Sequence, residues 1–179
     1  MLGLSCEGLN FFEDTMKKHV DTVTTTFESP LGRMRLAARP QGLCGVWFEG
    51  QRHQPDPSAW PIAPDHPLLR QAMLQLTQYF AGKRKQFEVP LDLSAGTPFQ
   101  QSVWQALLAL AFGQTGSYGN LSAQIGRPTA VRAVSGAVAR NPLSIIVPCH
   151  RVLGSHGALT GYAGGLERKA ALLKMEASH

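Results

Sequence analysis

Cysteine is scarce in this sequence, and no apolar run in it is long. The three cysteines among 179 residues are Cys6, Cys44 and Cys149, which lie far apart. An odd, dispersed set argues against a disulfide framework and favours a reducing compartment, so we expect a cytoplasmic protein. No stretch reaches the roughly 20 apolar residues that cross a bilayer, and the first residues show no basic leader ahead of an apolar segment. We therefore expect neither a membrane protein nor a secreted disulfide-rich domain.

Acidic residues are almost absent from the second half of the chain. Residues 1–97 hold ten Lys or Arg and ten Asp or Glu, whereas residues 98–179 hold seven Lys or Arg against Glu167 and Glu176 alone. The whole net charge of +5 therefore falls on the second half. A basic half beside a neutral one suggests a polyanionic partner, although a solvated basic surface without any partner would have the same composition.

The first half combines short β-prone runs with one helical pattern. Hydrophobic residues make up 44% of the chain, enough for a packed core. Turn residues separate three β-prone runs, which predicts a small antiparallel meander at 21–27, 32–38 and 43–50. After a proline-rich loop, apolar residues at helical spacing predict a helix over 67–81 that Gly82 ends. Residues 86–93 are compatible with one more strand, and residues 1–20 with a loose leader.

The second half is predicted to be mostly helical. Thr97 and Pro98 form an N-cap and a first helical residue. A short helix over 121–125, a turn containing Gly126 and a second helix over 129–140 have the spacing of a helix-turn-helix. We thus expect an α+β fold, with a small antiparallel sheet in an N-terminal α/β domain (1–95) and a mostly helical C-terminal domain (96–179).

The second helix of this pair has two distinct faces. Val131, Val134 and Val138 are predicted to form its buried stripe. Its remaining face carries small residues together with Arg132, which could enter a DNA groove and fill the space left by a displaced base. Small residues also permit close packing between helices, so an ordinary structural role remains the alternative.

The segment IIVPCHRV (145–152) places a thiol beside an imidazole at the end of an apolar run that resembles buried extended chain. Pro148 fixes φ immediately before Cys149. An imidazole near a thiol can take its proton and so produce the nucleophilic thiolate. Because neighbouring side chains of an extended chain point to opposite sides, Cys149 and His150 could cooperate only through a turn or a bridging water.

A carboxylate could orient the imidazole from its other nitrogen. Glu176 is the better candidate in this half, because Glu167 adjoins Arg168 and Lys169 on a predicted surface. A buried cysteine beside a capping histidine is the alternative interpretation. Cys6 and Cys44 have no such neighbours and are expected to be idle.

The string NPLSIIVPCHRV (141–152) resembles the active-site signature of the O6-alkylguanine-DNA alkyltransferases, also called methylated-DNA–protein-cysteine methyltransferases. The likeness continues through GTPFQQSVW, SYGNLSAQIGRP, VRAVSGA and TGYAGGLERKAALLKME, and covers essentially all of residues 96–176. ESPLGRMRLAA and QGL fit more loosely. The motif PCHR alone is moderately specific, but these neighbours in this order make the resemblance specific.

The resemblance implies direct-reversal DNA repair, in which an alkyl group passes irreversibly from O6-alkylguanine to the protein's own cysteine after base flipping. O4-alkylthymine is a further possible substrate. Cys149 would accept the alkyl group, His150 would take its proton through a water, and Glu176 would orient His150. Asn141 would hold the turn of the site. Each molecule would react once, as a single-turnover methyltransferase.

The remaining implied roles concern DNA. Tyr118 would help to rotate the damaged nucleotide and assist the departing guanine, and Arg132 would fill the vacated stack. The backbone at Val152 and Ala163 would read the base edge, with Tyr162 lining the pocket. Contacts to the DNA backbone are implied for Gln100, Gly119, Arg127 and Ser155.

The resemblance also implies what surrounds the reaction. The N-terminal domain would be ribonuclease-H-like, and the partner would be double-stranded DNA approached from the minor groove by a monomer. In a bacterium the protein would be nucleoid-associated. Whether copies cluster along DNA is left open. No cofactor is implied. Some relatives hold a structural zinc, but the counterpart positions here are Val20, Arg39 and Cys44, so we expect no metal.

Three other classes of protein are alternatives to an alkyltransferase, and each predicts a different feature. A non-enzymatic lesion-binding relative would carry Trp in place of Cys149. A helix-turn-helix transcription regulator would bind undamaged DNA with sequence preference, whereas repair predicts salt-sensitive binding to any duplex. A cysteine hydrolase would need an oxyanion hole and a His from elsewhere in the chain.

Overall fold

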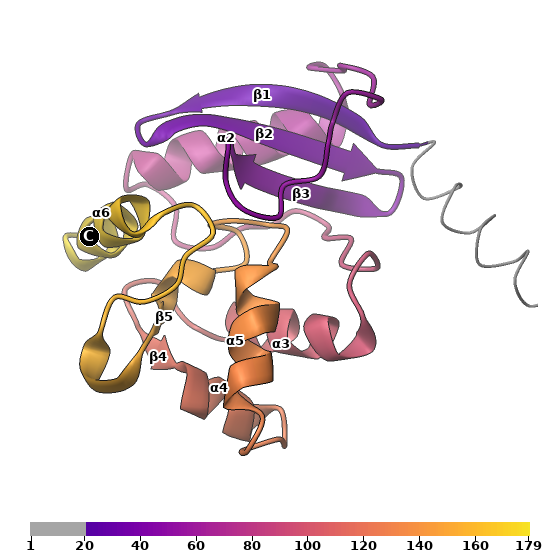
Figure 1. Cartoon of the computed structure of the whole chain (residues 1–179). Helices are drawn as coiled ribbons and strands as arrows, with labels where there is room; N and C mark the ends of the chain where they lie inside the picture. Colours follow the sequence, from indigo (N-terminus) through magenta and orange to yellow (C-terminus); the bar gives the residue numbers. More distant parts are fainter. Residues whose placement is uncertain (1–20) are drawn as a thin grey trace, which may run out of the picture.

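A computed structural model describes residues 21–179. The elements run in the order β1 (Val23–Ser29), β2 (Gly32–Arg39), β3 (Gly42–Phe48), α2 (Pro67–Phe80), α3 (Pro98–Leu108), β4 (Gly116–Ser117), α4 (Tyr118–Gln124), α5 (Val131–Ala139), the 3-10 helix η1 (Cys149–Arg151), β5 (Val152–Leu153), the 3-10 helix η2 (Ser155–Gly157) and α6 (Leu166–Ala177). In Figure 1 the three-stranded sheet lies above the helical second half, with α2 behind it. The expected leader and Cys6 lie outside the described residues.

The first three strands form the predicted antiparallel meander in the order β1-β2-β3. Strand β3 is buried along its whole length because both of its faces are covered. One face packs against α2, while Cys44 and Trp47 on the other face pack with Trp60 of the proline-rich loop. The sheet is thus covered on both faces, with the helical second half packed beside it.

Residues 86–93 do not form the additional strand that the sequence suggested. Leu91 makes a single isolated bridge with Leu43. The Leu43 N–H donates to the Pro90 carbonyl, and the Asp92 N–H donates back to Leu43. Pro90 has no N–H to continue a ladder, which limits the pairing to this one point.

The predicted helix over 67–81 is confirmed as α2, with Pro67 in its first turn. Helix α3 begins with a complete capping box, in which Thr97 accepts from the Gln100 N–H and the Gln100 side chain accepts from Thr97. The helix-turn-helix is present as α4 and α5, and Gly126 occupies the turn at φ +71°.

The buried stripe of α5 differs from the predicted one. Val134 and Val138 are buried as expected, but Val131 is 39% exposed and Ala137 is buried in its place. Val131 is the first residue of α5, and its side chain lies at the exposed end of the helix. The Trp104 indole N–H donates to the Ala137 carbonyl and fixes α3 against this face.

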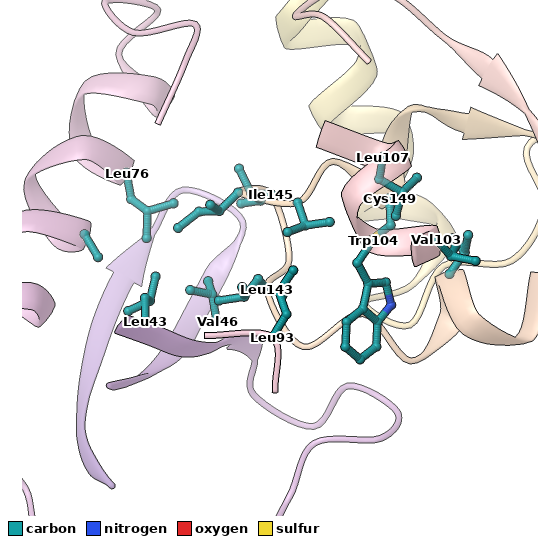
Figure 2. Packing of buried hydrophobic residues seen from close by; sticks show 14 of the residues in the cluster. Leu43, Val46, Leu76, Leu93, Val103, Trp104, Leu107, Leu143, Ile145 and Cys149 are labelled. Atoms are coloured by element: carbon teal, nitrogen blue, oxygen red, sulfur yellow. The ribbon is translucent and has the colours of Figure 1, made fainter. Parts of the chain in front are cut away.

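One continuous group of buried side chains runs through both halves of the described chain (Figure 2). It includes residues of β3 and α2 as well as residues of α3 and the segment before Cys149, among them Leu43, Val46, Leu76, Val103, Leu107, Leu143 and Ile145. The thiol of Cys149 lies at the edge of this core. None of the described helices has the length and apolar character needed to traverse a bilayer.

Candidate active site

Asn141 organises the segment that leads to the thiol. Its buried amide donates to the carbonyl oxygens of Val147 (2.8 Å) and Leu143 (3.4 Å), and its Oδ1 accepts from the Leu143 N–H (3.0 Å). Ile145 has φ +74°, in the left-handed region, so the chain turns here. The expectation of buried extended chain is right about burial and wrong about conformation, because the chain pairs with β3 only at the Val46–Leu143 bridge and then turns over residues 144–146.

Cys149 begins the 3-10 helix η1, which provides a turn at the thiol. The residue is 5% exposed, and Asn141 Nδ2 donates to its Sγ at 3.0 Å. Burial raises the pKa of the thiol above its ordinary 9.0, while the Asn141 hydrogen bond and the charge of Lys169 oppose the rise. The resting group is therefore a neutral thiol, and its activation needs a base.

His150 is fully buried, and its Nε2 lies 2.7 Å from Glu176 Oε1. The other ring nitrogen, Nδ1, is buried and has no hydrogen-bond partner among residues 21–179. Burial lowers the pKa of His150 below 6.5, although the hydrogen bond and charge of Glu176 act to raise it. The neutral imidazole that results can donate from Nε2 to the carboxylate, which leaves Nδ1 as the proton acceptor.

Glu176 is a buried anion with several donors. Arg151 binds it with both arms of the guanidinium, Nε to Oε2 at 2.8 Å and Nη2 to Oε1 at 2.9 Å. Burial alone would raise the pKa of Glu176, but the hydrogen bonds from His150 and Arg151 outweigh it and hold the pKa well below 4.5. Arg151 Nη1 also donates to the Leu110 carbonyl, which ties the site to the end of α3.

Two further donors reach Glu176 from outside the motif. The Tyr79 hydroxyl, from α2, donates to Oε1 at 2.6 Å. The Gly113 N–H donates to Oε2 at 3.1 Å. The carboxylate is thus held from α2, from the loop after α3 and from η1, in addition to its own helix α6.

Lys169 is a buried cation whose polar partners are backbone carbonyls. Its Nζ donates to Val152, to Thr160 (2.7 Å) and to Gly161 (3.4 Å), and no carboxylate of the described chain pairs with it. Burial lowers the pKa of Lys169, while the nearby Cys149 raises it. The side chain therefore pins the loop after η2 and brings positive charge toward the thiol.

An open groove of about 1060 Å³ lies between α4, α5 and η2. Its lining includes four residues implied for lesion or DNA contact, namely Tyr118, Gly119, Arg132 and Ser155. The Tyr118 hydroxyl lies 3.4 Å from the Thr160 carbonyl. Burial and the charge of Cys149 both raise the pKa of Tyr118, which keeps its hydroxyl protonated.

The remaining implied residues fall into two places. Val152 is buried directly after η1, and Tyr162 and Ala163 line a neighbouring hollow of about 600 Å³. Gln100 and Arg127 lie outside the lining of the groove, Gln100 in the cap of α3 and Arg127 at the end of the turn after α4. The structure therefore brings Cys149, His150, Glu176 and Asn141 together and spreads the DNA candidates over a wider surface.

Sequence reasoning missed Arg151, Tyr79, Gly113 and Lys169. The role of Arg151 could have been predicted, because a basic residue inside an apolar motif needs a carboxylate partner and the second half offers only two carboxylates. No sequence pattern indicated the role of Tyr79, because its hydroxyl binds a carboxylate that is 97 residues away in the chain. Helical periodicity marks Tyr79 as core and says nothing of the hydroxyl.

The positions considered for zinc have other surroundings. Arg39 Nη1 pairs with Asp92 at 3.2 Å, Cys44 is buried, and Val20 lies outside the described residues. Within residues 21–179 no group of three or more His, Cys, Asp or Glu side chains is arranged to hold a metal ion.

Two family models match the chain. Residues 98–178 match the DNA-binding domain of 6-O-methylguanine DNA methyltransferase, and residues 22–93 match its ribonuclease-like domain. The methylated-DNA–protein-cysteine methyltransferase of Mycobacterium bovis is 48% identical over 153 residues, which cover 86% of this chain and 91% of that protein. The protein of that name from Methanosarcina acetivorans is also 48% identical, over 85% of this chain and 96% of its own.

Solved structures agree with these matches. A crystal structure of Mycobacterium tuberculosis OGT in complex with DNA superposes with a TM-score of 0.82 at 46% identity, covering 87% of this chain and 93% of that one. The M. tuberculosis O6-methylguanine methyltransferase gives a TM-score of 0.80 at the same identity, over 88% and 93%. On its sequence, its fold and its site, the chain belongs to the family of methylated-DNA–protein-cysteine methyltransferases.

Proposed function

We propose that this protein repairs DNA by moving an alkyl group from the O6 atom of guanine to Cys149. The observation that carries the proposal is a buried thiol next to an imidazole–carboxylate pair, in a chain whose relatives are named for methyl transfer from DNA to a protein cysteine. The same geometry accounts for each step of that reaction.

Activation comes first. His150 is a neutral base with Nδ1 available, and we assign to a water the transfer of the Cys149 proton to this nitrogen. The Glu176 anion stabilises the imidazolium that forms, 2.7 Å from Nε2. The thiolate is stabilised in turn by the Asn141 amide and the charge of Lys169. The neutral thiol thereby becomes the nucleophilic thiolate.

Transfer is an in-line displacement at carbon. A bond forms between Sγ and the alkyl carbon, the bond from that carbon to guanine O6 breaks, and guanine leaves with the electron pair. Tyr118 donates a hydrogen bond or proton to the departing base, for which a protonated phenol is required. The thioether product has no leaving group that the protein can expel, so each molecule reacts once.

Access requires that the damaged nucleotide leave the stack, at a cost of a few kcal/mol. Arg132, near the start of α5, fills the vacated space while α5 approaches the minor groove. Tyr162 lines the pocket for the turned-out base, with the backbone at Val152 and Ala163 on its edge. Backbone contacts to DNA fall to Gln100, Gly119, Arg127 and Ser155.

The proposal extends to the organisation of the chain. An α/β unit over residues 1–95 supports an alkyltransferase unit over residues 96–179, and one copy acts on one lesion. The protein works in the cytoplasm, where the net basic charge of its second half attracts duplex DNA.

The test is the intact and peptide mass of the protein after it is mixed with duplex DNA that carries one O6-methylguanine. We expect a gain of one methylene unit on the peptide that holds Cys149, ending at one per protein. Tight binding to the lesion without any gain in mass would replace the proposal by one of damage recognition.

A further inference from the structure

One oxygen of the Glu176 carboxylate is shared between three donors. Oε1 lies 2.6 Å from the Tyr79 hydroxyl, 2.7 Å from His150 Nε2 and 2.9 Å from Arg151 Nη2. The oxygen that faces the imidazole is therefore also the acceptor of a phenol that belongs to the first half of the chain.

The Tyr79 ring has little freedom. The residue is fully buried in α2, and its ring packs against Phe80, Phe87 and Phe112 with centroids 5.4, 5.5 and 6.0 Å away. Burial and the charge of Glu176 raise the pKa of Tyr79, so the hydroxyl stays protonated and always donates. A rigid ring with a permanent donor fixes both the position and the charge distribution of Oε1.

We propose that Tyr79 is a positioning residue for alkyl transfer, which acts through Glu176 to set the basicity of His150; this rests on the proposed function. A hydrogen bond to Oε1 withdraws part of the negative charge that would otherwise stabilise the imidazolium. Without it, Glu176 would pair more strongly with a protonated His150. Tyr79 thus keeps His150 in the neutral form that can accept the thiol proton.

Charged side chains from η1 and α6 surround this pair, and Tyr162, from the loop before α6, lies close enough to Glu176 to interact with it electrostatically. Arg151 from η1 and Lys169 from α6 both act to lower the pKa of His150, and Glu176 acts to raise it. Cys149 is the neighbour that loses a proton during the reaction. Replacement of Tyr79 by phenylalanine removes one neutral donor and leaves every formal charge in place, which makes it the cleanest probe.

The experiment measures single-turnover transfer from free O6-benzylguanine against pH, in the unaltered full-length chain and in Tyr79→Phe. We expect the midpoint of the acidic limb to move to higher pH by about one unit, the size of one hydrogen bond to a charged group. The rate on the alkaline plateau should fall only slightly. A uniform loss at every pH, with an unmoved midpoint, would show that Tyr79 contributes packing alone.

Two variants serve as controls. Thr77→Val removes a hydroxyl from the same helix, where it bonds only to the Met73 carbonyl at an exposed position. Phe87→Leu loosens the packing of the Tyr79 ring and leaves its hydroxyl intact. Thr77→Val should keep the midpoint of the unaltered chain, and a shift there would refute the assignment to the hydroxyl. In Phe87→Leu the donor remains, so any shift of the midpoint should be smaller than that of Tyr79→Phe.

A titration of the His150 imidazole by ¹⁵N NMR separates this proposal from the proposed function. If the unaltered protein transfers no alkyl group, the repair proposal fails, yet Tyr79→Phe should still raise the pKa of His150. If Tyr79→Phe does not fold, the Tyr79 hydroxyl proton in the unaltered protein should appear as a slowly exchanging downfield resonance. Its absence would overturn the inference.

Discussion

The protein has two buried cysteines in its described part, and their surroundings differ. Cys44 is 6% exposed and Cys149 is 5% exposed. Burial raises the pKa of both thiols, that of Cys44 to about 11. Cys44 packs with Ala37, Trp47 and Trp60, whereas Cys149 has an amide donor and stands beside a buried base.

Burial by itself raises the pKa of both thiols and so disfavours the nucleophilic thiolate. What distinguishes Cys149 is a set of polar groups that can take its proton and then stabilise the charge that remains. Those groups are costly to bury, and apart from His150 Nδ1 the polar atoms described around the site have specific partners. The chemistry therefore depends on the polar groups around the sulfur more than on the sulfur itself.

The largest expected effect comes from removing one sulfur at a time. Cys149→Ser should abolish alkyl transfer, because no alkoxide is available near neutral pH. Cys44→Ser should leave the transferred mass at one alkyl group per protein. Intact mass after reaction with O6-methylguanine duplex reports both, and transfer retained in Cys149→Ser would refute the assignment of the nucleophile.

The second largest effect should come from removing the Glu176 carboxylate, which binds His150 beside Cys149. Glu176→Gln leaves the Arg151 guanidinium buried without a counter-charge, which should lower the free energy of unfolding by about 3–5 kcal/mol. Denaturant unfolding measures the loss. Glu167→Gln, at an exposed position of the same helix, is the matched control and should change little.

The third effect concerns the access of the damaged base, since Arg132 and Tyr118 line the same groove. Arg132→Ala should slow repair in duplex DNA by about tenfold or more, because a stacked base costs a few kcal/mol to turn out. Attack on free O6-benzylguanine should be nearly unchanged. Arg140→Ala, at the far end of α5, tests for general loss of charge, and equal losses on both substrates would contradict the role of Arg132.

The smallest effect is a pH dependence of stability that the Cys149 region alone should cause. The pKa of His150 is lowered in the folded protein, so the unfolded chain takes up this proton first as the pH falls. Stability is present above about 6.5 and declines below it, by about 1.4 kcal/mol for each unit of pKa shift. Thermal melting between about pH 7.5 and about pH 5.5 should show the decline in the unaltered chain and in the exposed control His179→Gln.

Local patterns in the sequence predicted the elements that local forces determine. The meander, α2 and the helix-turn-helix follow from alternation, helical spacing and Gly126. The predicted burial of Val131 and the predicted strand over 86–93 were wrong. Burial at a helix end and strand pairing beyond Pro90 depend on neighbours that are distant in the chain.

The residues of the candidate site also divide into those that local sequence predicted and those that depend on distant packing. The signature around Cys149 indicated the nucleophile and its histidine, and the shortage of acidic residues pointed to Glu176. The Tyr79 hydroxyl and the Gly113 N–H could not be predicted, since they meet Glu176 only when the two halves pack. The Asn141 turn was implied by resemblance, but the left-handed Ile145 behind it was not.

The burial of Cys149 has a consequence for the stability of the protein after an alkyl group has been added to Sγ. Cys149 belongs to the buried core, so an alkyl group on Sγ would enlarge a buried side chain, and overpacking of a well-packed site typically costs about 1–3 kcal/mol. A thioether can no longer become an anion, so Lys169 loses the neighbour whose charge it complements. On the proposed function, the alkylated protein should therefore unfold more readily than the unreacted protein.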